Sequence, residues 1–399
     1  MQHRLGHYLS IGASALSIGA SLLTVGVLRK GLTDSAAIGA DMRRAARAEG
    51  AWPPVTALVP ARDEEVAIAA CVTSIIDQDY PALDVVVIDD GSTDRTPAIL
   101  DELQQRHPDR LRVLRSGPTP PTGWAGKTYA LWQGYAQVRD EVPWLLFVDA
   151  DVTLKPGTVR AAVGYARAQG LGLLSLVPAP RTPDFWSRLL IPLIARFYLL
   201  AQVDPLRPAR RGSVEDAAAI GQFILVRHDV YRTVGGHPAV RDSTAEDVAL
   251  AKRFRAHGFT TLMVNALDFA EVDTYRGLGE LWEGASKNLF VVARGRWSTL
   301  VAVLALEWLY GLIPVTLLAL PRRPRGRVPL WANRIAVALV ALSYGRYLRV
   351  VGVPLRYVAL YPLSALLASL VFLDSARKVR LRGSVTWKGR AIDMRTLFP

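Results

Sequence analysis

The stretch that decides the fold is WLLFVDAD, residues 144–151. Five apolar or aromatic residues in a row lead into two carboxylates, Asp149 and Asp151, in i, i+2 spacing. A short continuous apolar run of this kind indicates a strand that is buried on both faces of a parallel sheet. Open α/β sheets bind ligands beyond the carboxyl ends of their strands, so we expect both carboxylates at a ligand site. Hard oxygen donors suit Mg²⁺ or Mn²⁺ bound to a diphosphate, while a solvated strand end is the plain structural alternative.

The rest of the first 290 residues alternates between strand and helix patterns. Residues 55–60, 85–88, 111–114, 171–177 and 220–226 are predicted strands. Helical stretches lie between them, one ending near Ile76 and one covering residues 129–138. Such alternation predicts βαβ units and an α/β, Rossmann-like domain with a mostly parallel sheet.

Acidic and small residues follow the first two of these strands. Residues 55–60 run into Ala61, Arg62 and Asp63, and residues 85–88 run into Asp89, Asp90 and a glycine. Ser92 or Thr93 then supplies a helix cap.

Lys127 lies in the segment Gly126-Lys127-Thr128, which imitates the end of a phosphate-binding loop. The Walker pattern requires a glycine where this chain has Pro121, so the motif fails. A lysine at a helix N-terminus can still contact a phosphate, because the free N–H groups there already favour anions. An ordinary surface lysine is the alternative.

Glu246 and Asp247 begin a predicted helix. Carboxylates in a first turn stabilise the helix dipole, which is a sufficient structural explanation. The functional alternative is a general base.

The composition favours a membrane surface over nucleic acid. The 399-residue chain carries a formal net charge of +13, yet 51% of it is hydrophobic, and it shows no nucleic-acid-binding motif. The single cysteine, Cys71, excludes an internal disulfide and a thiolate zinc cluster.

Both ends of the chain contain membrane-type segments. Residues 8–28 lack any charge and match a bilayer core in length, which predicts an N-terminal transmembrane anchor rather than a cleaved signal peptide. Basic residues follow this segment, so the positive-inside rule predicts a cytoplasmic catalytic domain at the cell membrane.

Near the C-terminus, residues 299–320, 329–345 and 354–373 are apolar, and we expect the first to be re-entrant or interfacial and the other two to span. This arrangement keeps the basic loop 322–327 and the basic tail inside. Glu307 within an apolar segment is a functional-site candidate. Residues 185–201 are predicted to form either an interfacial helix or a core helix.

Four ordered motifs carry a family resemblance: residues 59–65, residues 87–94, Asp149 with Asp151, and Glu246 with Asp247. Together they resemble a family 2 inverting glycosyltransferase with the GT-A nucleotide-sugar fold. The membrane segments resemble the subset that glycosylates lipids, such as ceramide, hopanoid-associated and carotenoid-acid glycosyltransferases. Softer matches lie at residues 123–127, 286–288 and 387–390.

The resemblance implies a role for each matching residue. A UDP-sugar would contact Asp63 and Asp90, in a base pocket shaped by Pro60 and Ala61, while Asp247 would be the catalytic base with Glu246 in support. Asp149 and Asp151 would bind the ribose and the metal, Mg²⁺ or Mn²⁺, with Asp151 the better metal ligand. The nucleotide-sugar set implied in this way is Pro60, Ala61, Asp63, Asp89, Asp90, Lys127, Asp149, Arg296 and Trp297.

The chain departs from the family pattern after the base. Polysaccharide and glucosylceramide synthases carry Q/R-x-x-R-W, and here Arg296-Trp297 is present while the first position holds Ala293. Arg294 is one residue too close. A processive synthase and strict ceramide-type chemistry are therefore disfavoured, and Arg and Trp beside a membrane are also ordinary interface anchors.

These observations predict a membrane-bound, metal-dependent transferase that moves one sugar, glucose by family default, from a UDP-sugar to a lipid acceptor. The alternatives are a polyprenyl-phosphate sugar transferase, a processive polysaccharide synthase, and a catalytically silent nucleotide-sugar-binding scaffold. The expected organisation is an anchor (1–28), a basic linker (29–54), a GT-A domain (55–290), a membrane region (291–376) and a basic cytoplasmic tail (377–399).

Overall fold

The computed structural model describes residues 2–117, 119–201, 213–243, 245–273, 275–292, 296–319, 330–379, 384–387 and 390–393. It divides into two compact units. The α/β unit comprises Thr33–Arg181 and Asp204–Asp273, and the helical unit comprises Met1–Leu32, Thr182–Val203 and Thr274–Phe398. Ala293, Arg294, the loop 322–327, residues 388–389 and most of the tail lie outside the described residues.

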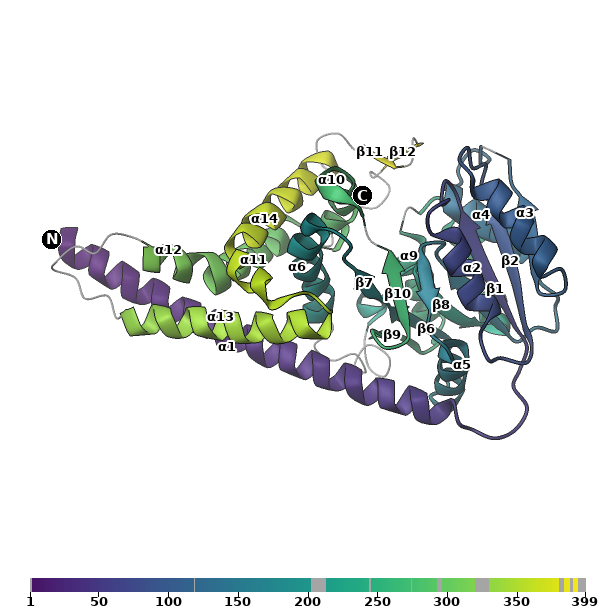
Figure 1. Ribbon diagram of the computed structural model, residues 1–399, viewed down its shortest axis with the longest axis horizontal. Coiled ribbons are helices and arrows are strands. Elements are labelled where there is room, and N and C mark those ends of the chain that lie inside the picture. Colours follow the sequence, from purple (N-terminus) through teal and green to yellow (C-terminus); the bar gives the residue numbers. More distant parts are fainter. Residues whose placement is uncertain are drawn as a thin grey trace. The chain divides into compact units, whose positions relative to one another are not determined.

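A seven-stranded sheet forms the centre of the α/β unit, in the order β3-β2-β1-β4-β8-β6-β9 (Figure 1). Its strands are β1 (Val55–Ala61), β2 (Leu83–Asp89), β3 (Leu111–Arg115), β4 (Trp144–Val148), β6 (Leu173–Val177), β8 (Phe223–Arg227) and β9 (Thr261–Asn265). Only β8 runs antiparallel to its neighbours, and the other pairs are parallel. The predicted α/β class with a mostly parallel sheet is confirmed.

A second sheet lies in the same unit and was not predicted from the sequence. It orders β5 (Val152–Leu154), β10 (Ala270–Asp273) and β7 (Ala179–Arg181). Strands of three or four residues are too short to show a hydrophobic period, which is why the pattern analysis missed them.

Helices cover both faces of the large sheet (Figure 1). On one face, buried residues of α2 (Ile68–Ile76), α3 (Thr96–Arg106) and α5 (Thr158–Ala168) join one hydrophobic core. On the other face, α4 (Gly126–Tyr135), α8 (His228–Thr233) and α9 (Glu246–Ala256) contribute to a second core. The result is a three-layer α/β/α arrangement.

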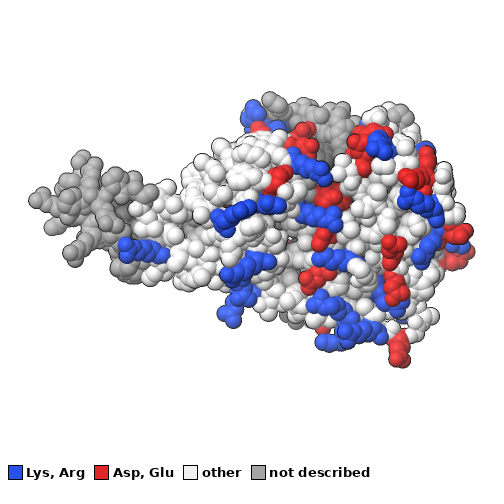
Figure 2. All heavy atoms as spheres, viewed as in Figure 1, with Lys and Arg blue, Asp and Glu red and all other residues white. Residues whose placement is uncertain are grey.

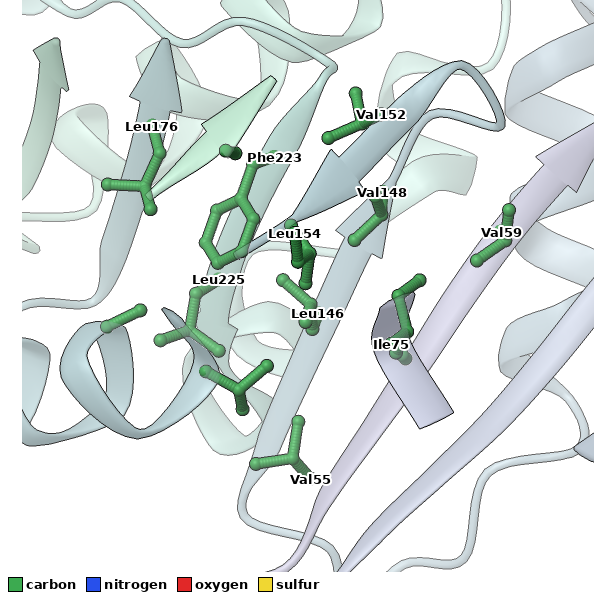
Figure 3. Packing of buried hydrophobic residues seen from close by; sticks show 14 of the residues in the cluster. Val55, Val59, Ile75, Leu146, Val148, Val152, Leu154, Leu176, Phe223 and Leu225 are labelled. Carbon is green, nitrogen blue, oxygen red and sulfur yellow. The ribbon is translucent and has the colours of Figure 1, made fainter. Parts of the chain in front are cut away.

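The core residues of the first face interdigitate between strands and helices (Figure 3). Val59, Val148 and Phe223, from β1, β4 and β8, lie on the same side of the sheet as Ile75 of α2. All five residues of β4 are buried, as the continuous apolar run predicted for a strand covered on both faces. This burial fixes β4, and with it the position of Asp149 at its end.

Helix α4 begins three residues earlier than the sequence predicted. It runs from Gly126 to Tyr135, with Ala125 extended at its N-cap. Lys127 is therefore the second residue of the helix and lies at its N-terminal end.

The helical unit contains α6 (Phe185–Ala201), α10 (Gly277–Val292), α11 (Trp297–Glu307), a π-helix (Trp308–Leu312), α12 (Ile313–Ala319), α13 (Leu330–Val350) and α14 (Tyr361–Arg377). Leu189, Leu190 and Leu193 of α6 are fully buried in the core of this unit, so α6 is a core helix there. On the face drawn in Figure 2, charged side chains are dense over the α/β unit and sparse over the helical unit.

In the part of the chain that the structure describes, three segments are long and apolar enough to cross a membrane: Ala15–Ala45, Trp297–Thr316 and Leu355–Arg377. The first lies in helix α1 (Gln2–Ala45), which continues well past residue 28 into the segment expected to be a linker. Ile38 and Met42 are buried in the core of the α/β unit, and this burial explains why the helix continues. The re-entrant form expected for residues 299–320 stays a prediction, because the segment is also long enough to span.

Candidate active site

The carboxyl end of β4 carries the two predicted carboxylates. The Asp149 N–H donates to the Gln222 carbonyl at 3.3 Å, and the Asp151 carbonyl accepts from the Asp273 N–H at 2.9 Å. Both side chains lie close enough to Cys71 that, after burial, their negative charges are the next causes that raise the pKa of its thiol. The two carboxylates therefore act on one small region, but only Asp149 is among the residues that line the pocket described below, so a ligand contact for Asp151 stays a prediction.

Lys127 connects one of these carboxylates with the start of α9. Its Nζ lies 2.6 Å from Asp149 Oδ1 and 2.9 Å from Glu246 Oε1. Burial by itself lowers the pKa of the Lys127 ammonium, but Asp149, Glu246 and Asp247 together hold that pKa well above its usual value. Lys127 is therefore a half-buried cation shared by two carboxylates, unlike an ordinary solvated surface lysine, and its contact with a phosphate stays a prediction.

The side chain of Asp247 accepts two hydrogen bonds from backbone N–H groups. The Gly221 N–H donates to its Oδ2 at 2.8 Å, and the Val248 N–H donates to its Oδ1 at 2.7 Å. Burial, followed by the neighbouring charge of Glu246, raises the pKa of Asp247 to about 6, although Lys127 acts in the opposite direction. A carboxylate with a pKa near neutrality is suited to general-base catalysis.

These groups line one pocket. Its lining includes Lys127, Asp149, Glu246 and Asp247, together with Gly221 and Pro60. The structure thus brings five of the predicted residues together, from α4, β4, α9 and the end of β1.

His237 also lines this pocket and was not predicted as a site residue. The Tyr231 hydroxyl accepts from the His237 backbone N–H at 3.0 Å and lies 2.7 Å from His237 Nδ1. Donation of the hydroxyl proton to Nδ1 satisfies the buried phenol and leaves the ring proton on Nε2. Burial and the Lys127 charge lower the pKa of His237 to about 3, so the imidazole is neutral. The Gly-Gly-His turn was visible in the sequence, but nothing local indicated where the ring points.

The loops after β1 and β2 form a second cluster of predicted residues. Asp63 adopts a positive φ of 49°, and its Oδ1 accepts from the Thr93 N–H at 2.8 Å. The Asp90 N–H donates to the Ala61 carbonyl at 2.8 Å, and the Asp90 carbonyl accepts from Arg62 at 2.9 Å. A non-glycine residue held at positive φ by the surrounding structure is typical of a functional loop.

Asp89, Arg296 and Trp297 differ from the other predicted residues. The Asp89 carboxylate accepts from Arg115 at 2.6 Å and from the Ser92 N–H at 3.0 Å, so it braces the end of β2. Arg296 and Trp297 begin α11 in the helical unit. Their contact with a nucleotide sugar stays a prediction.

The residues fit a divalent cation only in part. Among the described residues, no group of three histidine, cysteine, aspartate or glutamate side chains is arranged to bind a metal. Asp149 and Asp151 offer two hard carboxylates, which is the donor set that Mg²⁺ or Mn²⁺ uses when a diphosphate supplies further oxygens. The chain's own residues therefore supply at most two carboxylate ligands at this position, and metal binding stays a prediction.

Comparison with known proteins decides the family of this domain. Residues 56–234 match the model of glycosyl transferase family 2. These residues form a glycosyl transferase family 2 domain. The match includes Lys127, Asp149, Asp151 and Gly221, and it ends before Glu246 and Asp247. The resemblance of the sequence motifs to this family is confirmed.

Similar proteins extend over more of the chain. It is 28% identical over 341 residues to a 4,4'-diaponeurosporenoate glycosyltransferase of Staphylococcus aureus strain MRSA252, covering 84% of this chain and 87% of the relative. Among solved structures, a mannosyltransferase from Pyrobaculum calidifontis in complex with GDP-Man and Mn²⁺ is 18% identical, with a TM-score of 0.48 and coverage of 92% and 98%. The S. aureus TarS 1–349 structure with UDP-GlcNAc is 16% identical, with a TM-score of 0.40 and coverage of 85% and 95%.

Proposed function

We propose that this glycosyltransferase moves one sugar, most simply glucose, from a UDP-sugar to an apolar lipid acceptor at the cytoplasmic face of the cell membrane. The observation that carries the proposal is the pocket in which Asp247, with a pKa near 6, lies beside Lys127 and Asp149. Three helices with the length and composition of membrane spans support an acceptor that arrives from a bilayer.

Asp247 has the clearest chemical role for an acceptor that carries a hydroxyl. The hydroxyl oxygen attacks the anomeric carbon while the bond from that carbon to the diphosphate oxygen breaks. The hydroxyl proton passes to Asp247, and the bond electrons leave with UDP. The attack is a single displacement from the opposite side, so the configuration at the sugar inverts.

The leaving diphosphate needs positive charge where it departs. Lys127 supplies a positive charge in the lining of the pocket, and its position at the N-terminus of α4 adds the dipole of that helix. Asp149 and Asp151 would hold a divalent cation, which supplies Lewis-acid stabilisation of the diphosphate when bound.

A carboxylate acceptor is the second candidate, because the name of the S. aureus relative includes 4,4'-diaponeurosporenoate, a word with the ending of a carboxylate. A carboxylate is already deprotonated, so its attack on the sugar would need no base. With such an acceptor Asp247 would help to position the substrates or contribute its charge to the pocket, and it would not transfer a proton.

The test uses the full chain purified in detergent, with UDP-glucose and two matched long-chain acceptors, an alcohol and a carboxylic acid. Mass spectrometry should find a glycoside or a glycosyl ester, respectively. EDTA should stop transfer, and added Mn²⁺ or Mg²⁺ should restore it. Full activity in chelator would remove the metal role of Asp149 and Asp151. Absence of any transferred sugar with every UDP-sugar offered would contradict the donor assignment.

A further inference from the structure

Gly221 lies in the turn that leads into β8, between the carboxylates of the pocket. Its N–H donates to Asp247 Oδ2 at 2.8 Å. The next residue, Gln222, accepts the Asp149 N–H on its carbonyl at 3.3 Å. The backbone of this turn therefore fixes the end of β4 and the start of α9 relative to each other.

The missing side chain of Gly221 is needed for space rather than for backbone conformation. The residue is absent from the glycines with positive φ, so no left-handed backbone conformation requires a glycine there. A Cβ added there would lie 2.5 Å from Lys127 Nζ, whereas Glu246 Oε1 and Asp149 Oδ2 would be at 3.4 and 3.5 Å. Only the ammonium would be displaced, because the two carboxylate oxygens would remain at contact distance.

We propose that Gly221 is a positioning residue. Because it has no side chain, it leaves a space, here called the seat, in which the Lys127 ammonium bridges Asp149 and Glu246. The effect of this seat on sugar transfer rests on the proposed function, but the seat itself is a property of the apo protein. Gly221 lies within the family match, but none of the sequence motifs includes it.

The seat has two consequences for the site. It keeps a cation 2.6 Å from Asp149 and 2.9 Å from Glu246, so the acidic pocket is partly neutralised before any ligand binds. It also keeps the Lys127 charge close to Asp247, where that charge opposes the rise in the pKa of the base. Displacing the ammonium would therefore raise the pKa of Asp247, so that its carboxyl group would stay protonated up to a higher pH.

The ammonium that would clash is the far end of the flexible Lys127 side chain, so the substitution can be tested without disturbing the backbone. A Gly221→Ala variant should fold, because the clash can be relieved by moving one ammonium group. Gly279→Ala is the matched control: Gly279 lies in α10 of the helical unit, and an added Cβ there meets nothing within 4 Å.

The first experiment measures lysine reactivity without any turnover. The full chain in detergent is acylated briefly, and the extent of modification at each lysine is read by mass spectrometry. Lys155 and Lys252 serve as internal references, since their side chains are 40% and 36% exposed against 35% for Lys127. In wild type and Gly279→Ala, Lys127 should react more slowly than both references.

In Gly221→Ala, the reactivity of Lys127 relative to the references should rise several-fold, because a Cβ 2.5 Å from Nζ would push the amine out of its ion pairs with Asp149 and Glu246 and make it available to the reagent. Unchanged reactivity would overturn the proposal, whatever the variant does in transfer. If reactivity rises while wild-type protein transfers no sugar, the seat is supported and the proposed function fails.

A double-mutant cycle supplies the second experiment. Gly221→Ala should slow transfer and move the acid limb of the pH profile upward, whereas in a Lys127→Met background it should have no further effect. Independent, multiplicative losses would show that Gly221 does not act through Lys127. Should Gly221→Ala fail to fold, Gly221→Ala/Lys127→Met should fold, because the clashing group is gone. If the double variant also fails, the glycine is required for another reason and the proposal is wrong.

Discussion

Two charge clusters, a half-buried one in the α/β unit and a fully buried one in the helical unit, show how differently a protein can use an ion pair. In the α/β unit, Lys127 is shared by Asp149 and Glu246, with Asp247 lining the same pocket. In the helical unit, Arg196 pairs with Glu307, whose Oε2 accepts from the Tyr361 hydroxyl at 2.6 Å. The first cluster has more carboxylates than cations, and the second is balanced.

Exposure separates the clusters as clearly as charge. The side chains of Arg196 and Glu307 are 0% and 4% exposed, whereas Lys127 and Asp149 are 35% and 27% exposed. The Arg196 guanidinium also lies over the ring of Tyr310, with 4.9 Å to the centroid. A closed, neutral cluster fixes the partners of the helices that contribute to it, while an open cluster with unbalanced carboxylates attracts a cationic or metal-bound ligand.

The π-helix fits the structural role of the second cluster. It begins at Trp308, directly after Glu307, and it brings Gly311 against Tyr361. A Cβ on Gly311 would lie 1.8 Å from the Tyr361 ring, so only glycine allows this approach. We interpret Glu307 as a partner that fixes Arg196 and Tyr361, rather than as the functional-site residue that the sequence suggested.

The largest expected effect is on catalysis at the open cluster. Asp247→Asn should reduce transfer to a hydroxyl acceptor by about 10² to 10⁴-fold, the usual contribution of a general base. UDP binding, measured by calorimetry, should remain close to wild type. Transfer to a carboxylate acceptor should fall much less, because no proton has to be removed. Normal turnover with the alcohol would rule out Asp247 as the base.

The next effect is on stability at the closed cluster. Arg196→Met alone should destabilise the protein by about 3–5 kcal/mol, because it leaves the Glu307 charge buried and unpaired. Arg196→Met/Glu307→Met should recover most of that loss, as apolar replacements of buried pairs often do. Thermal unfolding in detergent measures both. If the single and double variants are equally unstable, the pair is not the source of the cost.

The smallest effect concerns pH at the open cluster. Because the pKa of Asp247 is raised to about 6, the ionised base is lost as the pH falls through 6, and transfer to an alcohol should decline about tenfold per pH unit below it. Stability depends on pH in the opposite direction to the transfer rate. The folded protein binds the Asp247 proton more tightly than the unfolded chain does, so the contribution of Asp247 to the free energy of unfolding falls as the pH rises toward 6. A rate that stays flat from pH 7 to 5 would contradict the raised pKa.

The sequence was informative where a function is encoded locally. The apolar run before Asp149 required a buried strand, and the strand placed its carboxylates at the edge of the sheet. The ordered acidic motifs indicated the family, because each of them stands at the end of a strand or at the start of a helix, where a local pattern can be read. The length and lack of charge of the apolar segments likewise indicated membrane helices.

The tertiary structure decided which side chains meet. Lys127 and Glu246 are 119 positions apart, and no local pattern reveals that the start of α4 and the start of α9 face the same strand end. The space left by Gly221 and the orientation of His237 depend on packing from several elements, so they have no signature of their own. The raised pKa of Asp247 arises from burial and from the charge of Glu246, and burial exists only after the chain has folded.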